Sequence, residues 1–208
     1  MRLGFREFST RTTGDFGEYI AEMRLPNHNH RSTAAFVPYN GVMADETLEI
    51  TILELMHRTG LTLAVAESCT GGLVSHRITN VPGASEYFLG GIVAYGNEVK
   101  TDFLGVRTET LAVHGAVSEQ TVLEMAHGVR RVLSADIGAA VSGIAGPGGA
   151  TPDKPVGLVW IGLSAPGVEH AWKYIWQGDR LAVKEQSADA VLRHIVEYLR
   201  QVQGFDSV

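Results

Sequence analysis

The sequence predicts a three-layer α/β/α single domain with a mixed, mostly parallel sheet of about five strands. Two continuous apolar runs, residues 61–66 and 137–142, are typical of strands that are buried on both faces. Segments with helical spacing of apolar residues lie between such runs, as in folds that alternate strands and helices. Residues 156–164 and 170–176 flank the turn signal Ala165-Pro166-Gly167 and therefore predict an antiparallel pair at the end of the sheet.

Three longer helices are predicted, the first two from apolar residues at helical spacing and the last from its start at Gly178-Asp179. Asp45 can cap the first of these helices and Ser118 the second, because aspartate and serine are common N-cap residues. Gly60 ends the first helix, as glycine commonly does. We expect the three helices at residues 45–58, 119–133 and 178–202.

Shorter elements fill the segment between the two buried runs. Gly90-Gly91 inside one predicted strand indicates a β-bulge or a close approach of another backbone. The expected order is a helix at 70–79, a loop at 81–84, a strand at 87–95 and a short helix at 97–104.

Composition limits the class of protein. The 208 residues suffice for one ordinary domain with a tail, and 45% hydrophobic residues can form a sizeable core. A net charge of −6 argues against a nucleic-acid binder, and no apolar stretch approaches the ~20 residues of a membrane span. The single cysteine, Cys69, excludes an internal disulfide and suits a reducing compartment, so we expect a cytoplasmic protein.

Residues 1–43 differ from the rest of the chain. They are rich in Arg, Thr, Asn and His and have weak periodicity, so we expect a poorly ordered extension before a domain at 44–208. His28 and His30 could bind a metal, but no further Cys or His clusters near them, and a solvated tail is the better interpretation.

A polar turn follows the first buried run. The run ends at Glu67-Ser68-Cys69-Thr70, and Gly71-Gly72 then opens a helical pattern. Free N–H groups at a helix N-terminus favour negative charge, either a ligand phosphate or an oxyanion. Ser68 and Thr70 could each be a nucleophile, a hydrogen-bond donor or an N-cap, and the residues alone favour the cap. Cys69 could be a nucleophile, although a small buried side chain is the commoner role.

A glycine loop, residues 143–149, follows the second buried run. Ligands of such sheets bind beyond the carboxyl ends of the strands, so the loop and the polar turn are expected around one pocket. The loop is either a plain connection or a cradle of backbone N–H groups for a phosphate. Arg180 could bind a phosphate through two hydrogen bonds or form a surface pair with Asp179.

Seven short motifs follow one another along the chain in a characteristic order and spacing. They are Ala66-Glu67-Ser68-Cys69-Thr70-Gly71-Gly72, Pro82-Gly83-Ala84-Ser85, Tyr95-Gly96-Asn97-Glu98-Val99-Lys100, His114-Gly115-Ala116-Val117-Ser118, Ser142-Gly143-Ile144-Ala145-Gly146-Pro147, Lys154-Pro155-Val156-Gly157 and Gly178-Asp179-Arg180. This set resembles the CinA C-terminal domain family, which includes the nicotinamide-nucleotide amidohydrolases (NMN deamidases). The resemblance covers about residues 44–205.

The resemblance implies a function and a site. The implied reaction is deamidation of nicotinamide mononucleotide to nicotinate mononucleotide and ammonia in pyridine nucleotide recycling, without metal or cofactor. The family's Ser–Lys dyad corresponds to Ser85 and Lys100, and Ser68 and Tyr95 match further active-site positions. The substrate-binding positions that we expect are Thr70, Gly71, Gly143, Ile144, Ala145, Gly146 and Arg180.

The residues themselves set conditions on that dyad. The predicted strand connects Ser85 to Lys100, so their contact would require the chain to fold back or neighbouring elements to meet. A free lysine has a pKa of about 10.4, and burial would have to lower this pKa before Lys100 could act as a base. No His-Glu-x-x-His or Gly-x-Ser-x-Gly motif offers another hydrolase chemistry. The alternative function is a non-catalytic nucleotide-binding or regulatory module. We expect a homo-oligomer with neither nucleic-acid nor membrane partners.

Overall fold

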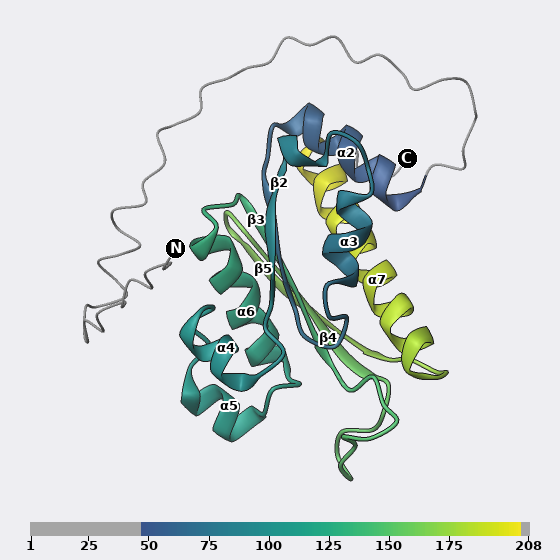
Figure 1. The fold of residues 1–208 in the computed structure, drawn as a ribbon. Helices are drawn as coiled ribbons and strands as arrows, with labels where there is room; N and C mark the ends of the chain where they lie inside the picture. Colours follow the sequence, from purple (N-terminus) through teal and green to yellow (C-terminus); the bar gives the residue numbers. More distant parts are fainter. Residues whose placement is uncertain (1–46, 205–208) are drawn as a thin grey trace, which may run out of the picture. The chain divides into compact units, whose positions relative to one another are not determined.

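In the computed structural model of the chain, residues 47–204 are described and form a five-stranded sheet with helices on both faces (Figure 1). The strand order is β2-β1-β3-β4-β5. Strand β1 pairs in parallel with β2 and β3, whereas β4 is antiparallel to both β3 and β5. The predicted class and mixed sheet are thus confirmed. The strands span Leu63–Glu67 (β1), Phe88–Val93 (β2), Ile137–Gly143 (β3), Leu158–Ala165 (β4) and Val168–Ile175 (β5).

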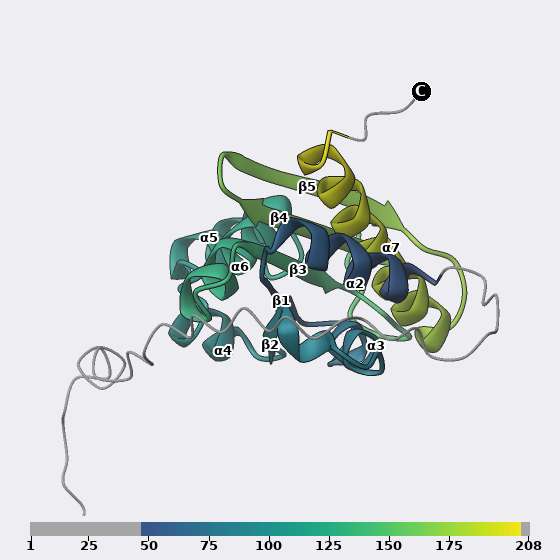
Figure 2. The same cartoon turned by 90° about the horizontal axis from the view of Figure 1, so that it is seen from above.

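Two helical layers cover the sheet, as Figures 1 and 2 show. Helices α2, α3 and α7 lie on one face, and α4, α5 and α6 lie on the other. Within residues 47–204, no helix is both long enough and apolar enough to cross a membrane. The helices span Leu48–Thr59 (α2), Leu73–Thr79 (α3), Asn97–Asp102 (α4), Thr108–His114 (α5), Glu119–Val132 (α6) and Arg180–Val202 (α7).

The two faces of β1 explain why its sequence is continuously apolar. Leu63 and Val65 pack in the core beneath α2, α3 and α7, whereas Ala64 and Ala66 pack beneath α6. Small residues on the α6 side let that helix approach the sheet closely. A β-carbon on Gly138 would lie 2.1 Å from the carbonyl oxygen of Ala126 in α6. The sheet is therefore buried on both sides, as the apolar run predicts.

Side-chain capping is observed at two helix starts, of which Ser118 is a predicted cap. Ser118 accepts a hydrogen bond from the Thr121 N–H at 3.2 Å, which confirms the start of α6. Asp179 accepts one from Ala182 at 2.9 Å at the start of α7. For α2, Asp45 lies outside the described residues, as do His28 and His30 of the extension. The residue preceding α2 is Thr47, whose side chain makes no capping hydrogen bond.

Other short elements differ from the prediction. Helix α3 begins at Leu73 rather than at residue 70, because Gly72 is its N-cap and has a left-handed φ of 97°. The short helix α5 and the 3₁₀ turn η1 (Ala84–Glu86) stand where the sequence predicted no helix.

The sequence predicts either a β-bulge or a close approach of another segment at Gly90-Gly91, and the structure shows both. Leu63 pairs with Phe88 but Ala64 pairs with Gly90, so β2 bulges by one residue. A β-carbon on Gly91 would lie 2.1 Å from Ser75 Oγ, because α3 crosses directly over β2 at this point. Glycine therefore lets α3 sit close to the end of β1, where the polar turn begins.

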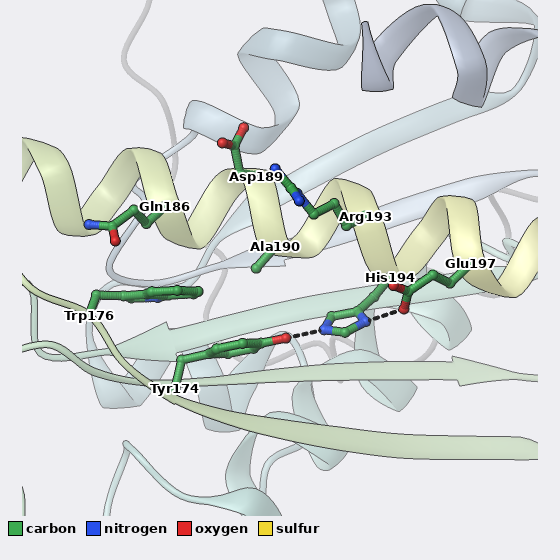
Figure 3. A pocket seen from close by; sticks show the side chains of 8 residues that line it. All are labelled: Tyr174, Trp176, Gln186, Asp189, Ala190, Arg193, His194 and Glu197. Atoms are coloured by element: carbon green, nitrogen blue, oxygen red, sulfur yellow. Dashed lines mark hydrogen bonds and ion pairs between the residues drawn. The ribbon is translucent and has the colours of Figure 1, made fainter.

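A groove of about 360 Å³ lies between β5 and α7, on the face opposite α6 (Figure 3). The Tyr174 hydroxyl lies 2.6 Å from His194 Nε2, and His194 Nδ1 lies 2.8 Å from Glu197 Oε2. The Trp172 ring stacks on the His194 ring with a centroid distance of 3.7 Å. Burial lowers the pKa of His194, while Glu197 raises it and His170 lowers it. His194 thus joins the sheet edge to α7 as a neutral group.

The lowered pKa of His194 predicts acid sensitivity of the fold. Below the ordinary histidine pKa of 6.5, the unfolded chain binds a proton that folded His194 resists. The free energy of unfolding should therefore fall as the pH drops below 6.5, by at most about 1.4 kcal/mol per pH unit. We expect urea unfolding at pH 7.5 and 5.5 to show a larger loss in wild type than in His194→Asn. Equal losses in the two proteins would contradict this role of His194.

Candidate active site

The carboxylate of Glu67 organises the turn after β1. Glu67 is fully buried at the carboxyl end of the strand. Its Oε2 accepts hydrogen bonds from Thr70 Oγ1 at 2.7 Å and from the N–H groups of Gly72 and Val74 at 2.9 and 3.1 Å. Its Oε1 accepts from the N–H and the hydroxyl of Ser75 at 2.8 and 2.7 Å. Five donors thus hold one side chain in place.

This arrangement corrects two expectations about the polar turn. The N–H groups of Gly72, Val74 and Ser75 at the start of α3 donate to Glu67 and are therefore not free for a ligand phosphate or oxyanion. Ser68 and Thr70 are not the N-cap of α3. Thr70 is completely buried and donates its hydroxyl to Glu67. Gly71, by contrast, is exposed on the turn.

Lys100 reaches the same turn from α4. Its side chain is buried, with 1% of the residue exposed. The Nζ atom donates to the carbonyl oxygens of Ala94 and Tyr95 at 2.7 and 3.3 Å and lies 3.3 Å from Ser68 Oγ. Burial lowers the pKa of Lys100, and the neighbouring Cys69 and the exposed Glu98 oppose this effect. The structure therefore meets the condition of burial that a lysine base requires.

A cavity of about 210 Å³ lies at the carboxyl ends of β1 and β3. The polar turn, the start of the glycine loop and the loop between α5 and α6 meet there, so the expectation of a shared pocket is confirmed. The cavity is lined by Ser68, Cys69, Tyr95, Asn97, Lys100, Ala116, Val117, Ser142, Gly143, Ala145 and Arg180.

Ser85 lies elsewhere. It is exposed in η1, before β2, whereas Lys100 follows β2. The six residues of β2 extend over roughly 20 Å. A residue before the strand and a residue after it therefore lie at opposite ends of the sheet's strands. The expected pairing of Ser85 with Lys100 is therefore not formed within the described chain, and the serine beside Lys100 is Ser68.

Arg180 closes one side of the cavity. Its Nη1 donates to the carbonyl oxygen of Gly146 at 2.8 Å, and its Nη2 donates to the hydroxyl of Tyr95 at 3.0 Å. The alternative of a surface pair with Asp179 is not realised, because the Asp179 carboxylate caps α7. Arg180 thus bridges the glycine loop and Tyr95, the residue whose carbonyl also holds Lys100.

The glycine loop offers fewer free N–H groups than expected. The Ile144 N–H donates to the carbonyl of Leu158, and the Ile144 carbonyl accepts from Gly157, each at 2.8 Å. Gly146 is buried and contributes its carbonyl to Arg180. Of the four loop positions expected to bind substrate, Gly143 and Ala145 are the two that line the cavity.

Cys69 also lines the cavity but remains a thiol. Burial raises its pKa to about 12, a value at which the thiolate is scarcely formed near neutral pH. Within residues 47–204, no group of three or more His, Cys, Asp or Glu side chains is placed to hold a metal ion. The hydroxyl that lies beside Lys100 in this cavity is that of Ser68.

The five hydrogen bonds to Glu67 predict a large effect of a nearly isosteric change. In Glu67→Gln an amide NH₂ would face backbone N–H donors, and charge-assisted hydrogen bonds would be lost. We expect the free energy of unfolding to fall by about 2 kcal/mol, which lowers the Tm by roughly 4–8 °C. Calorimetric melting of Glu67→Gln, with the exposed Glu185→Gln on α7 as control, measures this difference. An unchanged Tm would show that the carboxylate does not hold the turn.

Comparison with known proteins places this site in a family. Residues 45–199 match the family described as the CinA C-terminal domain. CinA-like proteins from Thermotoga maritima and Kosmotoga olearia are 48% and 49% identical over 157 and 146 residues, which are 75% and 70% of this chain. The chain spans 38% and 35% of the length of these curated relatives.

Solved structures agree with the sequence comparison. A CinA superfamily protein from Klebsiella pneumoniae superposes with a TM-score of 0.72 at 34% identity, covering 74% of this chain and 96% of that one. A competence/damage inducible protein from Agrobacterium tumefaciens gives 0.66 at 36% identity, covering 78% and 98%. The family match over three quarters of the sequence, together with these folds, shows that the chain belongs to the CinA C-terminal domain family.

Proposed function

We propose that this protein is an amidohydrolase that converts nicotinamide mononucleotide and water to nicotinate mononucleotide and ammonia. The observation that carries the proposal is the burial of Lys100 beside Ser68 in one cavity. A binding module has no need of a desolvated lysine next to a serine hydroxyl, whereas an amide hydrolase needs a nucleophile and a base in contact. The family resemblance supplies the substrate, and pyridine nucleotide recycling in the cytoplasm is the proposed setting.

The proposed reaction has two halves. Ser68 Oγ attacks the carboxamide carbon while its proton passes to neutral Lys100, and the ammonium so formed stabilises the neighbouring oxyanion. Lys100 then returns the proton to the departing nitrogen, the C–N bond breaks, and ammonia leaves an acyl ester on Ser68. In the second half, water attacks the ester and gives a proton to Lys100, which returns it to Ser68 as the acid is released.

The hydrogen bonds of Lys100 suit this exchange. Two carbonyl oxygens, of Ala94 and Tyr95, can hold two N–H bonds of the amine in either protonation state. The remaining position points toward Ser68 and is a lone pair in the neutral form and an N–H in the charged form. The proton can therefore move between Nζ and Oγ without reorientation of the lysine.

The two serines give the first test of the proposal. Ser68→Ala should lower kcat for nicotinamide mononucleotide by at least about 10³-fold, since loss of the nucleophile leaves only binding contributions. Ser85→Ala is the matched control, and an exposed hydroxyl in η1 should change kcat by no more than about twofold. Ammonia release in steady state measures both. The reverse pattern, with Ser85 essential and Ser68 dispensable, would exclude the proposed nucleophile.

Lys100 gives the second test. Because the base must be neutral, kcat should rise with pH through the pKa of Lys100, which lies below the ordinary value of 10.5. Lys100→Arg keeps the positive charge, but a guanidinium does not deprotonate in proteins. We expect this variant to lose roughly 10³-fold or more in kcat, as Lys100→Ala does, and to lose the pH-dependent rise. Turnover by Lys100→Arg near that of wild type would mean that Lys100 serves as a fixed charge only.

A further inference from the structure

We propose that Lys184 forms, with Arg180, an anion subsite at the mouth of the cavity, and that this subsite takes the phosphate of a phosphomonoester substrate. Lys184 follows Arg180 by one turn on α7, so both side chains lie on the same side of the helix. Its Nζ lies over Gly71, 3.8 Å from the place where a β-carbon on that glycine would stand. This inference rests on the proposed function for the identity of the substrate.

The subsite lies next to the nucleophile. The Gly71 N–H donates to the carbonyl of Ser68 at 3.2 Å, so the residue beneath the Lys184 ammonium closes the turn that begins at Ser68. Arg180 itself lines the cavity. Arg180 contacts the glycine loop at Gly146, and Lys184 lies over Gly71 in the polar turn, so the two cations stand beside the two segments that meet at the cavity.

Neither of these two residues has a carboxylate partner at ion-pair distance within residues 47–204. Like charges four residues apart on a helix repel, and cations near a helix N-terminus are also unfavourable. A bound dianion would relieve both repulsions.

Hydrogen-bond donors remain for such an anion. A guanidinium has five N–H donors, and Arg180 uses two of them on Gly146 and Tyr95, which leaves three. Lys184 donates no hydrogen bond within the described residues, so its three N–H bonds are available as well. Together they can satisfy the oxygens of a phosphomonoester.

Two further observations place the phosphate outside the cavity. The start of α3, which otherwise binds anions, is filled by Glu67. The cavity of about 210 Å³ is smaller than the roughly 300 Å³ and more of typical ligand pockets, so it suits a ring and its carboxamide better than a whole nucleotide. With the carboxamide at Ser68, the far end of the nucleotide must lie at the mouth.

The test compares substrates with and without the phosphate. We would measure kcat/KM for nicotinamide mononucleotide and for nicotinamide riboside in wild type, in Lys184→Met and in the control Lys173→Met, an exposed lysine on β5. Methionine keeps the apolar stem of lysine. The ratio of the two kcat/KM values should fall about tenfold in Lys184→Met, as loss of a charge-assisted contact implies, and stay within about twofold in the control. An unchanged ratio in Lys184→Met would overturn the proposal.

A binding measurement separates this proposal from the proposed reaction. Calorimetry on Ser68→Ala and on Ser68→Ala with Lys184→Met should show a Kd for nicotinamide mononucleotide about tenfold weaker in the double variant. If wild type releases no ammonia from either compound, the proposed hydrolysis is excluded. The two Kd values then test on their own whether Lys184 contributes to an anion subsite. Equal Kd values in the two proteins, or no binding by either, would overturn the subsite.

Discussion

The burial of a carboxylate at the start of α3 determines the architecture of the site. Glu67 ends β1 and accepts hydrogen bonds from the residues that begin the next helix. A buried charge is tolerated when hydrogen bonds satisfy it, and here five donors do so. The turn between strand and helix is therefore fixed at both ends, and Ser68, its first residue, is held directly after the buried carboxylate. The close approach of α3 to Gly91 completes the arrangement, because it brings Ser75 within reach of the carboxylate.

A second buried ionisable residue lies at the carboxyl end of β2, the strand next to β1. Lys100 is held by two carbonyl groups at the end of β2, and desolvation lowers its pKa. The neighbouring Cys69 is subject to the same desolvation, which raises its pKa instead and keeps it a thiol. One apolar environment thus favours the neutral forms of both groups. For Lys100 the neutral form is a base, whereas for Cys69 it is an unreactive side chain.

The sequence predicts the sheet and the long helices because their signals are local. Continuous apolar runs indicate strands buried on both faces, and Ser118 and Asp179 mark the helix starts that the structure shows. The positions of single side chains around the site depend instead on which end of a strand a motif occupies. Ser85 and Lys100 are close in sequence but lie at opposite ends of β2, so the pairing that the resemblance implies is not formed, and Lys100 contacts Ser68 instead. The strand predicted between these two residues is the feature of the sequence that argues against their contact.

Two other features of the site had no clear signal in the sequence. A glutamate at the end of an apolar run usually faces solvent, so the spacing of Glu67 from Gly72 and Ser75 did not indicate a buried network. Lys184 belongs to no recognised motif, and its place over Gly71 depends on how α7 packs against α3. Such contacts between distant segments follow from tertiary packing and become visible only in the folded chain.

Product analysis in ¹⁸O-water shows whether the Ser68–Lys100 site hydrolyses an amide. Purified protein of the full chain would be incubated with nicotinamide mononucleotide, and ammonia and the nucleotide product would both be quantified. We expect equal amounts of ammonia and nicotinate mononucleotide, with one ¹⁸O atom in the new carboxylate. Binding of the nucleotide without release of ammonia would exclude hydrolysis at this site and would identify the protein as a non-catalytic nucleotide-binding module.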